Sequence, residues 1–291
     1  MKLLKRYILL LAAAILLTGC AECAAELPQA EPEATPAMQE QQIEEPAPEA
    51  EVEDTAPEEE MPPVPAYDFT QSAPEREAVD NTYFADAAFV GDSRTDGFMI
   101  YSGIGTGKNL TSNGLSIFKL AEKKVLKIGG EKYTLLEALE MGSYGKVYLC
   151  LGVNELGVYD DEGFYNSYLA AIDSIRAIQP DAVIYIQGLI PINEGEIAAS
   201  GGNTQLNNEH LRVYNELMRK AAQEKQVVYL DLYSEFVDEN GELPPGASRD
   251  GVHLKKDYCQ RWLAYLQTHT VDPIDLGLNV TKTESEESIP A

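Results

Sequence analysis

The sequence predicts an α/β fold in which a mainly parallel sheet of five strands is covered by helices on both faces. Three observations predict it. Short apolar runs alternate along the chain with longer segments that have helical spacing. Most of these runs are nearly continuous instead of alternating with polar residues, which is typical of strands buried on both faces. Glycine or polar residues follow several of the runs directly, as they do in the loops of parallel α/β sheets.

The expected strands are short and rich in Val, Ile, Leu, Phe and Tyr. They cover residues 84–90, 108–112, 146–151, 182–187 and 227–230. The second is the most polar of the five, and it is followed by Asn113 and Gly114. A hairpin is expected at 125–134, because Gly129 and Gly130 lie between two short runs that favour strands.

The expected helices have apolar residues at spacings of three and four. They cover residues 95–101, 135–141, 162–178, 204–225 and 255–268. The first opens directly behind Ser93, and the third ends before Pro180, which cannot continue a helix. Residues 191–202 contain Gly, Asn and Glu, and they are expected to form a loop. No internal repeat is visible.

Residues 1–19 have the features of a lipoprotein signal peptide. A basic start precedes an apolar stretch at 8–17 that is too short for an ordinary membrane-spanning helix. The stretch ends in Leu-Thr-Gly-Cys at 17–20, which resembles a bacterial lipobox with Cys20 as the lipidated residue. The alternative is an ordinary signal peptide in which this cysteine is incidental. Lipid on Cys20 would anchor the mature protein to the cell membrane, outside the cytoplasm.

Residues 20–69 are rich in Ala, Glu, Pro and Gln, a composition that predicts a disordered acidic tether. Fourteen acidic residues and no Lys or Arg lie between Glu22 and Glu60, so this segment carries more than half of the formal net charge of −26. The acidity argues against nucleic-acid partners. The folded domain is expected at 70–272, and the polar residues 273–291 are expected to form a flexible tail.

Two strings in the expected domain carry the residue types of a serine hydrolase. Gly-Asp-Ser-Arg-Thr at 91–95 places Ser93 directly after the first strand, and Asp-Gly-Val-His at 250–253 precedes the last helix. A serine hydroxyl is a weak nucleophile unless an imidazole accepts its proton and a carboxylate orients that imidazole. The chain has three histidines, and only His253 has an aspartate, Asp250, three residues before it.

Together with Gly114 and with Asn154 in the Gly-Val-Asn-Glu string that follows the third strand, these strings resemble the four blocks of the SGNH (GDSL-type) hydrolase superfamily. The resemblance covers about residues 89–267. It implies a flavodoxin-like three-layer α/β/α sandwich that hydrolyses esters without a metal or another cofactor. It also implies that Ser93 is the nucleophile, His253 the base and Asp250 its orienter. The oxyanion hole would consist of the Ser93 and Gly114 backbone N–H groups and the Asn154 amide.

Two positions depart from the pattern of many relatives. Arg94 stands where many have Leu, and Glu155 stands where many have Asp. Arg94 is a candidate for contact with a substrate carboxylate or phosphate, and the alternative is that it pairs with an acid in the core. The glycine of the second block is the least certain assignment, since three other glycines compete with Gly114: Gly103, Gly105 and Gly107.

The remaining candidates have structural explanations. Cys150 and Cys259 are expected to be separate buried thiols, although a disulfide is permitted outside the cytoplasm. His210 and His269 lie in or near helices without a suitable carboxylate pattern, and they are interpreted as surface or packing residues. Trp262 is interpreted as core. No Cys/His cluster has metal-ligand spacing, so no metal is expected.

The leading hypothesis is a surface-tethered serine esterase that removes a small acyl group such as acetyl. Its expected location favours an acylated cell-envelope or environmental glycan as the substrate. The alternatives are a lipase, thioesterase or acyltransferase with the same residues, and a binding module that has lost activity. An α/β-hydrolase is disfavoured, because the string around Ser93 ends in Thr95 where that fold has a second glycine.

Overall fold

The computed structural model describes residues 67–278. The expected signal peptide (1–19), the lipidation site Cys20 and nearly all of the tether (20–69) lie outside the described residues, as does most of the tail (273–291). Among the described helices, none has the length and apolar character needed to cross a bilayer.

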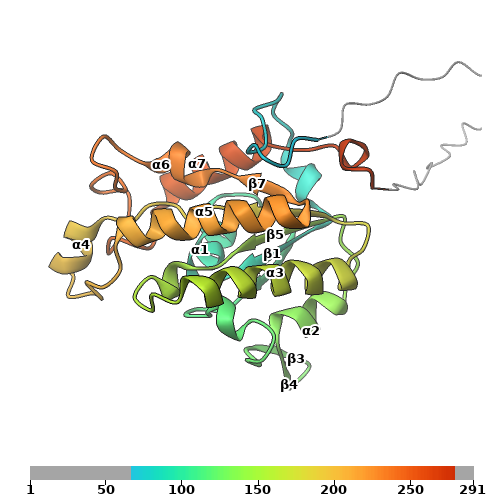
Figure 1. Cartoon of the computed structure of the whole chain (residues 1–291), viewed down its shortest axis with the longest axis horizontal. Helices are drawn as coiled ribbons and strands as arrows, with labels where there is room; N and C mark the ends of the chain where they lie inside the picture. Colours follow the sequence, from blue (N-terminus) through green and yellow to red (C-terminus); the bar gives the residue numbers. More distant parts are fainter. Residues whose placement is uncertain (1–66, 279–291) are drawn as a thin grey trace, which may run out of the picture. The chain divides into compact units, whose positions relative to one another are not determined.

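A five-stranded sheet forms the centre of the fold, with the strand order β2-β1-β5-β6-β7 (Figure 1). Its strands are β1 (Ala87–Gly91), β2 (Lys108–Thr111), β5 (Lys146–Cys150), β6 (Val183–Gln187) and β7 (Val228–Leu230). Every neighbouring pair is parallel. The carboxyl ends of all five strands therefore lie at one edge, where ligand groups gather in sheets of this kind. The predicted hairpin is also present, as β3 (Leu126–Ile128) and β4 (Glu131–Tyr133).

Helices flank both faces of this sheet and complete the predicted three-layer α/β/α sandwich. The longer ones are α1 (Ser93–Tyr101), α3 (Asp161–Ile178), α5 (Asn208–Lys225) and α7 (Lys256–Thr268). The shorter ones are α2 (Leu135–Glu140), α4 (Glu194–Ala199) and α6 (Leu232–Phe236). Figure 1 shows α3 and α5 side by side over one face, and α1 packs against α7 on the other.

An aromatic stack across three strands joins the sheet to the α1–α7 layer. The register places Phe89, Tyr148 and Tyr185 opposite one another on β1, β5 and β6. Their rings stack with centroid distances of 4.9 and 4.5 Å. Phe98 of α1 continues the cluster from Phe89 to Trp262 of α7, whose ring centroid is 4.8 Å from its own. Trp262 is almost fully buried, as predicted. The stack fixes α1, and hence Ser93, against the sheet.

Four helices differ from the prediction in presence or in starting point, and each is capped by an Asp or Asn side chain. In each case the side chain accepts a hydrogen bond from a backbone N–H two or three residues later and starts a helix there. Phe84, predicted to open the first strand, ends the 3-10 helix η1 (Asn81–Phe84) instead. Residues 194–199 form α4 instead of loop, α5 begins at 208 instead of 204, and α6 was not predicted. The capping residues are Asp80, Asn193, Asn207 and Asp231.

The folded part extends a few residues beyond the expected limits of 70–272. Residues 273–276, which we assigned to the tail, form the 3-10 helix η4 (Pro273–Leu276). The Tyr67 N–H donates to the Asp275 carbonyl at 3.3 Å, and Arg76 forms an ion pair with the Asp275 carboxylate at 3.0 Å. The two ends of the domain therefore hold each other, a contact between distant segments that local composition does not reveal.

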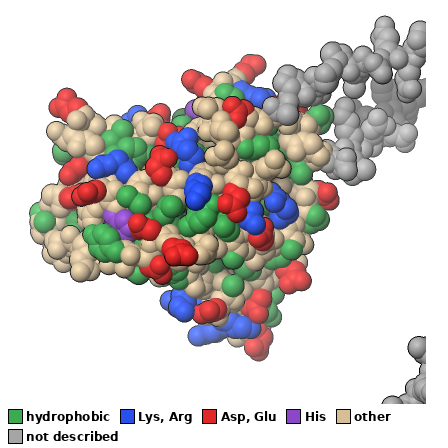
Figure 2. Space-filling model, viewed as in Figure 1, with side chains coloured by type: hydrophobic (Ala, Val, Ile, Leu, Met, Phe, Trp, Pro, Cys, Tyr) green, Lys and Arg blue, Asp and Glu red, His purple; other side chains and the backbone are tan. Residues whose placement is uncertain are grey.

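The surface of the described part mixes charges of both signs. Figure 2 shows acidic, basic and hydrophobic side chains interspersed over one face. This contrasts with the sequence between Glu22 and Glu60, where all fourteen charged residues are acidic. The domain face seen in Figure 2 is therefore not a single acidic patch.

Candidate active site

Ser93 is the first residue of α1 and lies at the carboxyl edge of the sheet, two residues after β1 ends. The chain can turn this tightly because residue 91 is glycine. A Cβ atom on Gly91 would lie 2.2 Å from the Thr95 hydroxyl oxygen and 2.8 Å from the Cys150 carbonyl oxygen. Asp92 caps the helix, since its carboxylate accepts the Arg94 N–H at 2.9 Å. The Ser93 hydroxyl is thus placed at the positive end of a helix dipole.

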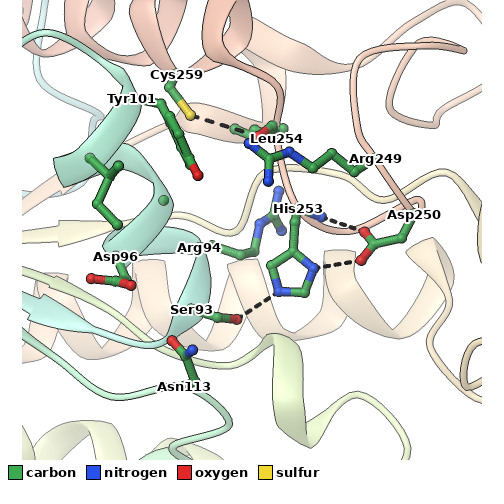
Figure 3. A pocket seen from close by; sticks show the side chains of 12 residues that line it. Ser93, Arg94, Asp96, Tyr101, Asn113, Arg249, Asp250, His253, Leu254 and Cys259 are labelled. Atoms are coloured by element: carbon green, nitrogen blue, oxygen red, sulfur yellow. Dashed lines mark hydrogen bonds and ion pairs between the residues drawn. The ribbon is translucent and has the colours of Figure 1, made fainter.

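The structure brings Ser93, His253 and Asp250 together in one hydrogen-bonded chain (Figure 3). His253 Nδ1 lies 2.8 Å from Asp250 Oδ2, and His253 Nε2 lies 2.9 Å from Ser93 Oγ. A carboxylate only accepts, so Nδ1 donates to Asp250. In the neutral imidazole this leaves Nε2 as the acceptor for the Ser93 hydroxyl. The arrangement can therefore take a proton from serine during attack on a carbonyl.

The Asp250 carboxylate is oriented by its own loop. Its Oδ1 accepts the backbone N–H groups of Val252 at 3.0 Å and His253 at 2.9 Å. Partial burial raises the pKa of Asp250, but the hydrogen bonds from the His253 N–H, the imidazole and the Val252 N–H outweigh it, so the pKa lies below its usual value. The carboxylate thus stays ionised beside the imidazole.

Gly251, within the same loop, adopts a conformation that other residues rarely take. Its φ is +88°, and a Cβ there would lie 2.5 Å from the Asn193 carbonyl oxygen. The Asn193 N–H donates to the Gly251 carbonyl at 2.9 Å. The Asp-Gly-Val-His string is therefore more than a turn: its glycine lets the loop pack against the start of α4.

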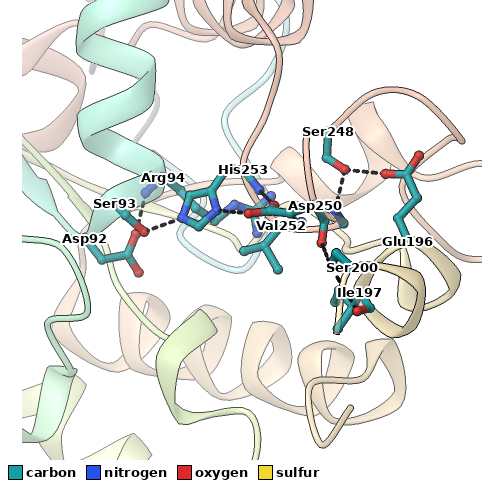
Figure 4. A network of polar contacts seen from close by, with 11 residues as sticks. Asp92, Ser93, Arg94, Glu196, Ile197, Ser200, Ser248, Asp250, Val252 and His253 are labelled. Carbon is teal, nitrogen blue, oxygen red and sulfur yellow. Dashed lines mark hydrogen bonds and ion pairs between the residues drawn. The ribbon is translucent and has the colours of Figure 1, made fainter. Parts of the chain in front are cut away.

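A second set of polar contacts supports this loop from α4, and the sequence analysis missed it (Figure 4). The Ser248 hydroxyl donates to Glu196 and accepts the Gly251 N–H at 2.7 Å. Glu196 also accepts the Gly246 N–H at 2.7 Å. Hydrogen bonds from Ser248 and Gly246 lower the pKa of Glu196. The one available signal was the Asn-x-x-Glu capping pattern at 193–196, which predicts a helix start at Glu194.

Asn154 connects the three strand ends. It lies in the 3-10 helix η3 (Val153–Glu155) that follows β5. Its Nδ2 donates to the Asp92 carboxylate at 3.2 Å and to the Leu115 carbonyl at 3.0 Å. Asp92 precedes Ser93 and Leu115 follows Gly114, so one amide links all three blocks. A substrate oxyanion that uses this amide would share or displace one of these two acceptors.

Gly114 is at the carboxyl end of β2 in an exposed turn with φ of +67°. Its competitors Gly103, Gly105 and Gly107 all precede β2, at the opposite edge of the sheet. Among the four glycines, only Gly114 therefore lies on the Ser93 side. Its neighbour Asn113 lines the same pocket as Ser93 (Figure 3).

Two buried carboxyl groups lie beneath this edge. Burial raises the pKa of Asp92 to about 6, against the opposing hydrogen bond from the Arg94 N–H. Burial raises the pKa of Glu155 to about 7, with hydrogen bonds from Ser116 and the Ile117 N–H opposing it. Glu155 thus ties η3 to the 3-10 helix η2 (Ile117–Lys119), which follows the Gly114 turn.

Of the two alternatives for Arg94, pairing with a core acid is not found among the ion pairs of residues 67–278, and contact with a substrate stays a prediction, since Arg94 lines the pocket beside Ser93. Its guanidinium is buried and donates to the carbonyl oxygens of Ile190 at 2.7 Å and Pro191 at 3.4 Å. Burial lowers the pKa of Arg94. In this structure the side chain holds the loop that follows β6 against α1.

Of the other histidines and cysteines, Cys259 lines the pocket beside Ser93, and the two histidines do not line it. Cys150 and Cys259 are separate buried thiols, as predicted, and burial raises the pKa of each, to about 12 and about 11. The prediction for His210 was incomplete: it is buried, but its Nε2 lies 2.8 Å from Asp161, which is too distant in sequence to be recognised. His269 stacks on Tyr265. Residues 67–278 contain no group of three or more His, Cys, Asp or Glu side chains placed to bind a metal.

A pocket of about 280 Å³ opens beside Ser93. Its polar side chains include His253, Asp96 and Arg249, and its apolar wall includes Ile100 and Leu254. The hydroxyl of Ser93 therefore faces a cavity that has room for a small group.

The fold and the Ser–His–Asp arrangement define a class, the serine-dependent α/β/α hydrolases. Sequence comparison agrees: the model of the GDSL-like lipase/acylhydrolase family matches residues 89–257, more than half of the chain. The chain therefore belongs to this family and is an ester-hydrolysing serine hydrolase. No curated protein is significantly similar to it in sequence.

A solved structure with a TM-score above 0.5 shares the fold, and others are similar to the chain. A Streptococcus pneumoniae protein described as a candidate platelet activating factor is 22% identical, with a TM-score of 0.52, over 65% of this chain and 84% of its own. A candidate acylhydrolase from Bacteroides fragilis is 16% identical, with a TM-score of 0.49, over 67% and 88%. A candidate GDSL-like lipase from Parabacteroides merdae is 15% identical, with a TM-score of 0.49, over 72% and 100%.

Proposed function

We propose that the chain hydrolyses small-acyl esters, such as acetyl esters, with Ser93 as nucleophile, His253 as general base and Asp250 as its orienter. The observation that carries this proposal is the continuous hydrogen-bonded chain from Asp250 through His253 to the Ser93 hydroxyl. Side chains in this order perform acyl transfer on several unrelated folds.

In the proposed reaction, Ser93 Oγ attacks the ester carbonyl carbon while His253 Nε2 takes the hydroxyl proton. The tetrahedral oxyanion is bound by the backbone N–H groups of Ser93 and Gly114 and by the Asn154 amide. Its collapse breaks the ester C–O bond, and the His253 proton goes to the departing alcohol. Water then attacks the acyl-serine with the same base, which releases the acid and restores Ser93.

The preference for a small acyl group rests on the pocket. Its volume of about 280 Å³ lies just below the range for small-molecule sites, roughly 300–1,000 Å³. A p-nitrophenyl ester series from acetate to palmitate tests this point. We expect the highest kcat/KM for acetate or butyrate. A maximum at long chains would instead identify a lipase, and product transfer to an added alcohol in place of water would identify an acyltransferase.

The proposed substrate is an acylated glycan of the cell envelope or the environment. The support comes from the lipobox-like string at 17–20, which marks Cys20 as the expected site of lipidation. The lipid would hold the domain at the membrane surface through the 20–69 segment. We expect Cys20→Ser to release the protein from membranes, or to leave it unprocessed, without loss of domain activity. Membrane fractionation tests the anchor, and acetate release from acetylated glycans tests the substrate.

A further inference from the structure

The loop that carries the base also brings an arginine to the pocket, over an aromatic ring. Arg249 and Tyr101 line the same cavity as Ser93 (Figure 3). The Arg249 guanidinium carbon lies 4.7 Å from the centre of the Tyr101 ring. A cation over an aromatic face is attracted to the ring, and a guanidinium carries five N–H donors, so groups remain that can donate to a ligand in the pocket.

The backbone of Arg249 is coupled to that of the base. The Arg249 N–H donates to the His253 carbonyl at 2.9 Å, and the flanking residues Ser248 and Leu254 form an antiparallel bridge. The loop that presents His253 to Ser93 therefore presents Arg249 as well. A group bound by Arg249 would keep a defined position relative to the reacting atoms.

The other charged side chains of the pocket already have partners. Arg94 donates to the Ile190 and Pro191 carbonyls. The Asp96 carboxylate accepts from Asn109 at 2.9 Å and from Thr111 at 3.2 Å. Asp250 is held by His253. Among residues 67–278, none of the ion pairs includes Arg249. An exposed guanidinium without a carboxylate partner is thus left in a cavity beside the nucleophile.

We propose that Arg249, supported by the Tyr101 ring, binds an anionic group of the substrate and makes the site selective for esters that carry a carboxylate or a phosphate close to the scissile bond. The inference rests on the proposed role of Ser93 and extends it to the substrate. A guanidinium donates two parallel hydrogen bonds to either anion, and charge-assisted bonds of this kind are among the strongest in proteins. The small volume of the pocket requires the anion to lie only a few bonds from the ester.

Matched ester pairs test this selectivity. On the acyl side, p-nitrophenyl butyrate is compared with mono-p-nitrophenyl succinate. On the alcohol side, 3-acetoxybutyramide is compared with 3-acetoxybutyrate, and 1-acetylglycerol with 1-acetylglycerol 3-phosphate. The measured quantity is the ratio of kcat/KM for the anionic ester to that for its neutral partner. The succinate and acetoxybutyrate pairs report a carboxylate, and the glycerol pair reports a phosphate.

We expect Arg249→Gln to lower this ratio by about 10- to 100-fold for at least one pair, as expected for loss of hydrogen bonds to a charged group. Tyr101→Leu removes the support and is expected to lower the ratio by about 2- to 5-fold. The matched control is Arg212→Gln. Arg212 is also exposed, and its guanidinium contacts a tyrosine hydroxyl, that of Tyr233, at 3.3 Å, but it does not line this pocket. Its loss should leave the ratio as in the wild type.

Two results overturn the inference in distinguishable ways. The inference is wrong if the wild type hydrolyses these esters and Arg249→Gln leaves every kcat/KM ratio unchanged. It is also wrong if Arg212→Gln lowers a ratio as much as Arg249→Gln does, because Arg249 then does not bind the anionic group. If the wild type hydrolyses none of the esters, neutral ones included, the proposed function is wrong, and so is the inference that rests on it.

Discussion

Residues 67–278 contain two Asp–His pairs with the same distance between nitrogen and oxygen but different surroundings. In both, an imidazole nitrogen lies 2.8 Å from a carboxylate oxygen: Asp250 with His253, and Asp161 with His210. The second nitrogen of His253 faces the Ser93 hydroxyl, which can give up a proton. The second nitrogen of His210 donates to the Leu156 carbonyl at 2.6 Å, which cannot.

Exposure separates the two pairs further. The His253 side chain is 45% exposed at the pocket, whereas that of His210 is 5% exposed. The His210 ring lies against those of Tyr159 and Tyr214, with centroid distances of 4.4 and 4.2 Å. A carboxylate beside a histidine therefore does not define a base. What matters is whether the other ring nitrogen reaches a hydroxyl in an accessible cavity.

The largest expected effect separates the two histidines. His253→Ala should lower kcat/KM for p-nitrophenyl acetate by about 10⁴-fold or more, because it removes the imidazole whose Nε2 lies within hydrogen-bond distance of the Ser93 hydroxyl. His210→Ala should leave the activity of the folded protein within about 3-fold, yet cost about 2–4 kcal/mol of stability, since it empties a buried aromatic stack. Steady-state kinetics and urea unfolding of both variants measure this. Equal losses of activity in the two folded variants would remove the distinction.

Replacement of the two carboxylates should likewise reduce activity at Asp250 and not at Asp161. Asp250→Asn should lower kcat by up to about 10⁴-fold, because an amide at this position favours the wrong imidazole tautomer. Asp161→Asn should leave kcat unchanged within error. If Asp250→Asn is harmless while His253→Ala is inactive, the site works as a Ser–His dyad and Asp250 serves only its loop.

The Asn154 amide should have a smaller effect. Asn154→Ala should lower kcat by about 10²-fold with little change in KM, because the amide stabilises the transition state more than the bound ester. The measurement is kcat and KM on one activated ester. A rise in KM at constant kcat would place Asn154 in ground-state binding and remove it from the oxyanion hole.

Glu155 gives the smallest expected effect, on stability rather than activity. It is a buried acid with no imidazole partner. Because its pKa is raised to about 7 in the folded state and is about 4.3 in an unfolded chain, the folded state binds more protons between these values. Its stabilising contribution is therefore complete below about pH 4 and is lost as the pH rises through about 7.

Urea unfolding at pH 5 and pH 8 tests this. Between these values the wild type should lose about 2–3 kcal/mol more than Glu155→Gln, which keeps an acceptor for the Ile117 N–H. Asp92, whose pKa is also raised, is present in both proteins, and its charge contributes to the raised pKa of Glu155, so the measured difference includes the coupling between the two acids. Parallel pH dependence in the two proteins would show that Glu155 does not titrate in this range.

The sheet and the Ser93–His253–Asp250 arrangement could be predicted because their signals are local. Strands buried on both faces appear as continuous apolar runs, and Ser93 and Asp250–His253 lie in short strings at strand ends or before a helix. The carboxyl-edge rule then predicts their convergence. Gly114 also follows from this rule, once the end of β2 is known.

The remaining parts depend on contacts between distant segments. Glu196, which supports the Asp250 loop through Ser248, lies in a helix that was predicted as loop. The carbonyl partners of Arg94 lie about 96 residues away in sequence. The Asp161–His210 pair joins two helices. No spacing rule along one chain predicts such pairs, because they depend on how elements pack and not on which elements form. The contact between the two ends of the domain could not be predicted for the same reason.

The central claim is that Ser93 is the nucleophile, and covalent labelling tests it most directly. A fluorophosphonate probe should label the wild-type domain at one site, and peptide mapping by mass spectrometry should place it on Ser93. Ser93→Ala, which removes only the attacking oxygen, should stay folded, take no label and show no ester turnover above the weak residual level. Label on another serine of the wild type, or near-wild-type turnover by Ser93→Ala, would contradict the account.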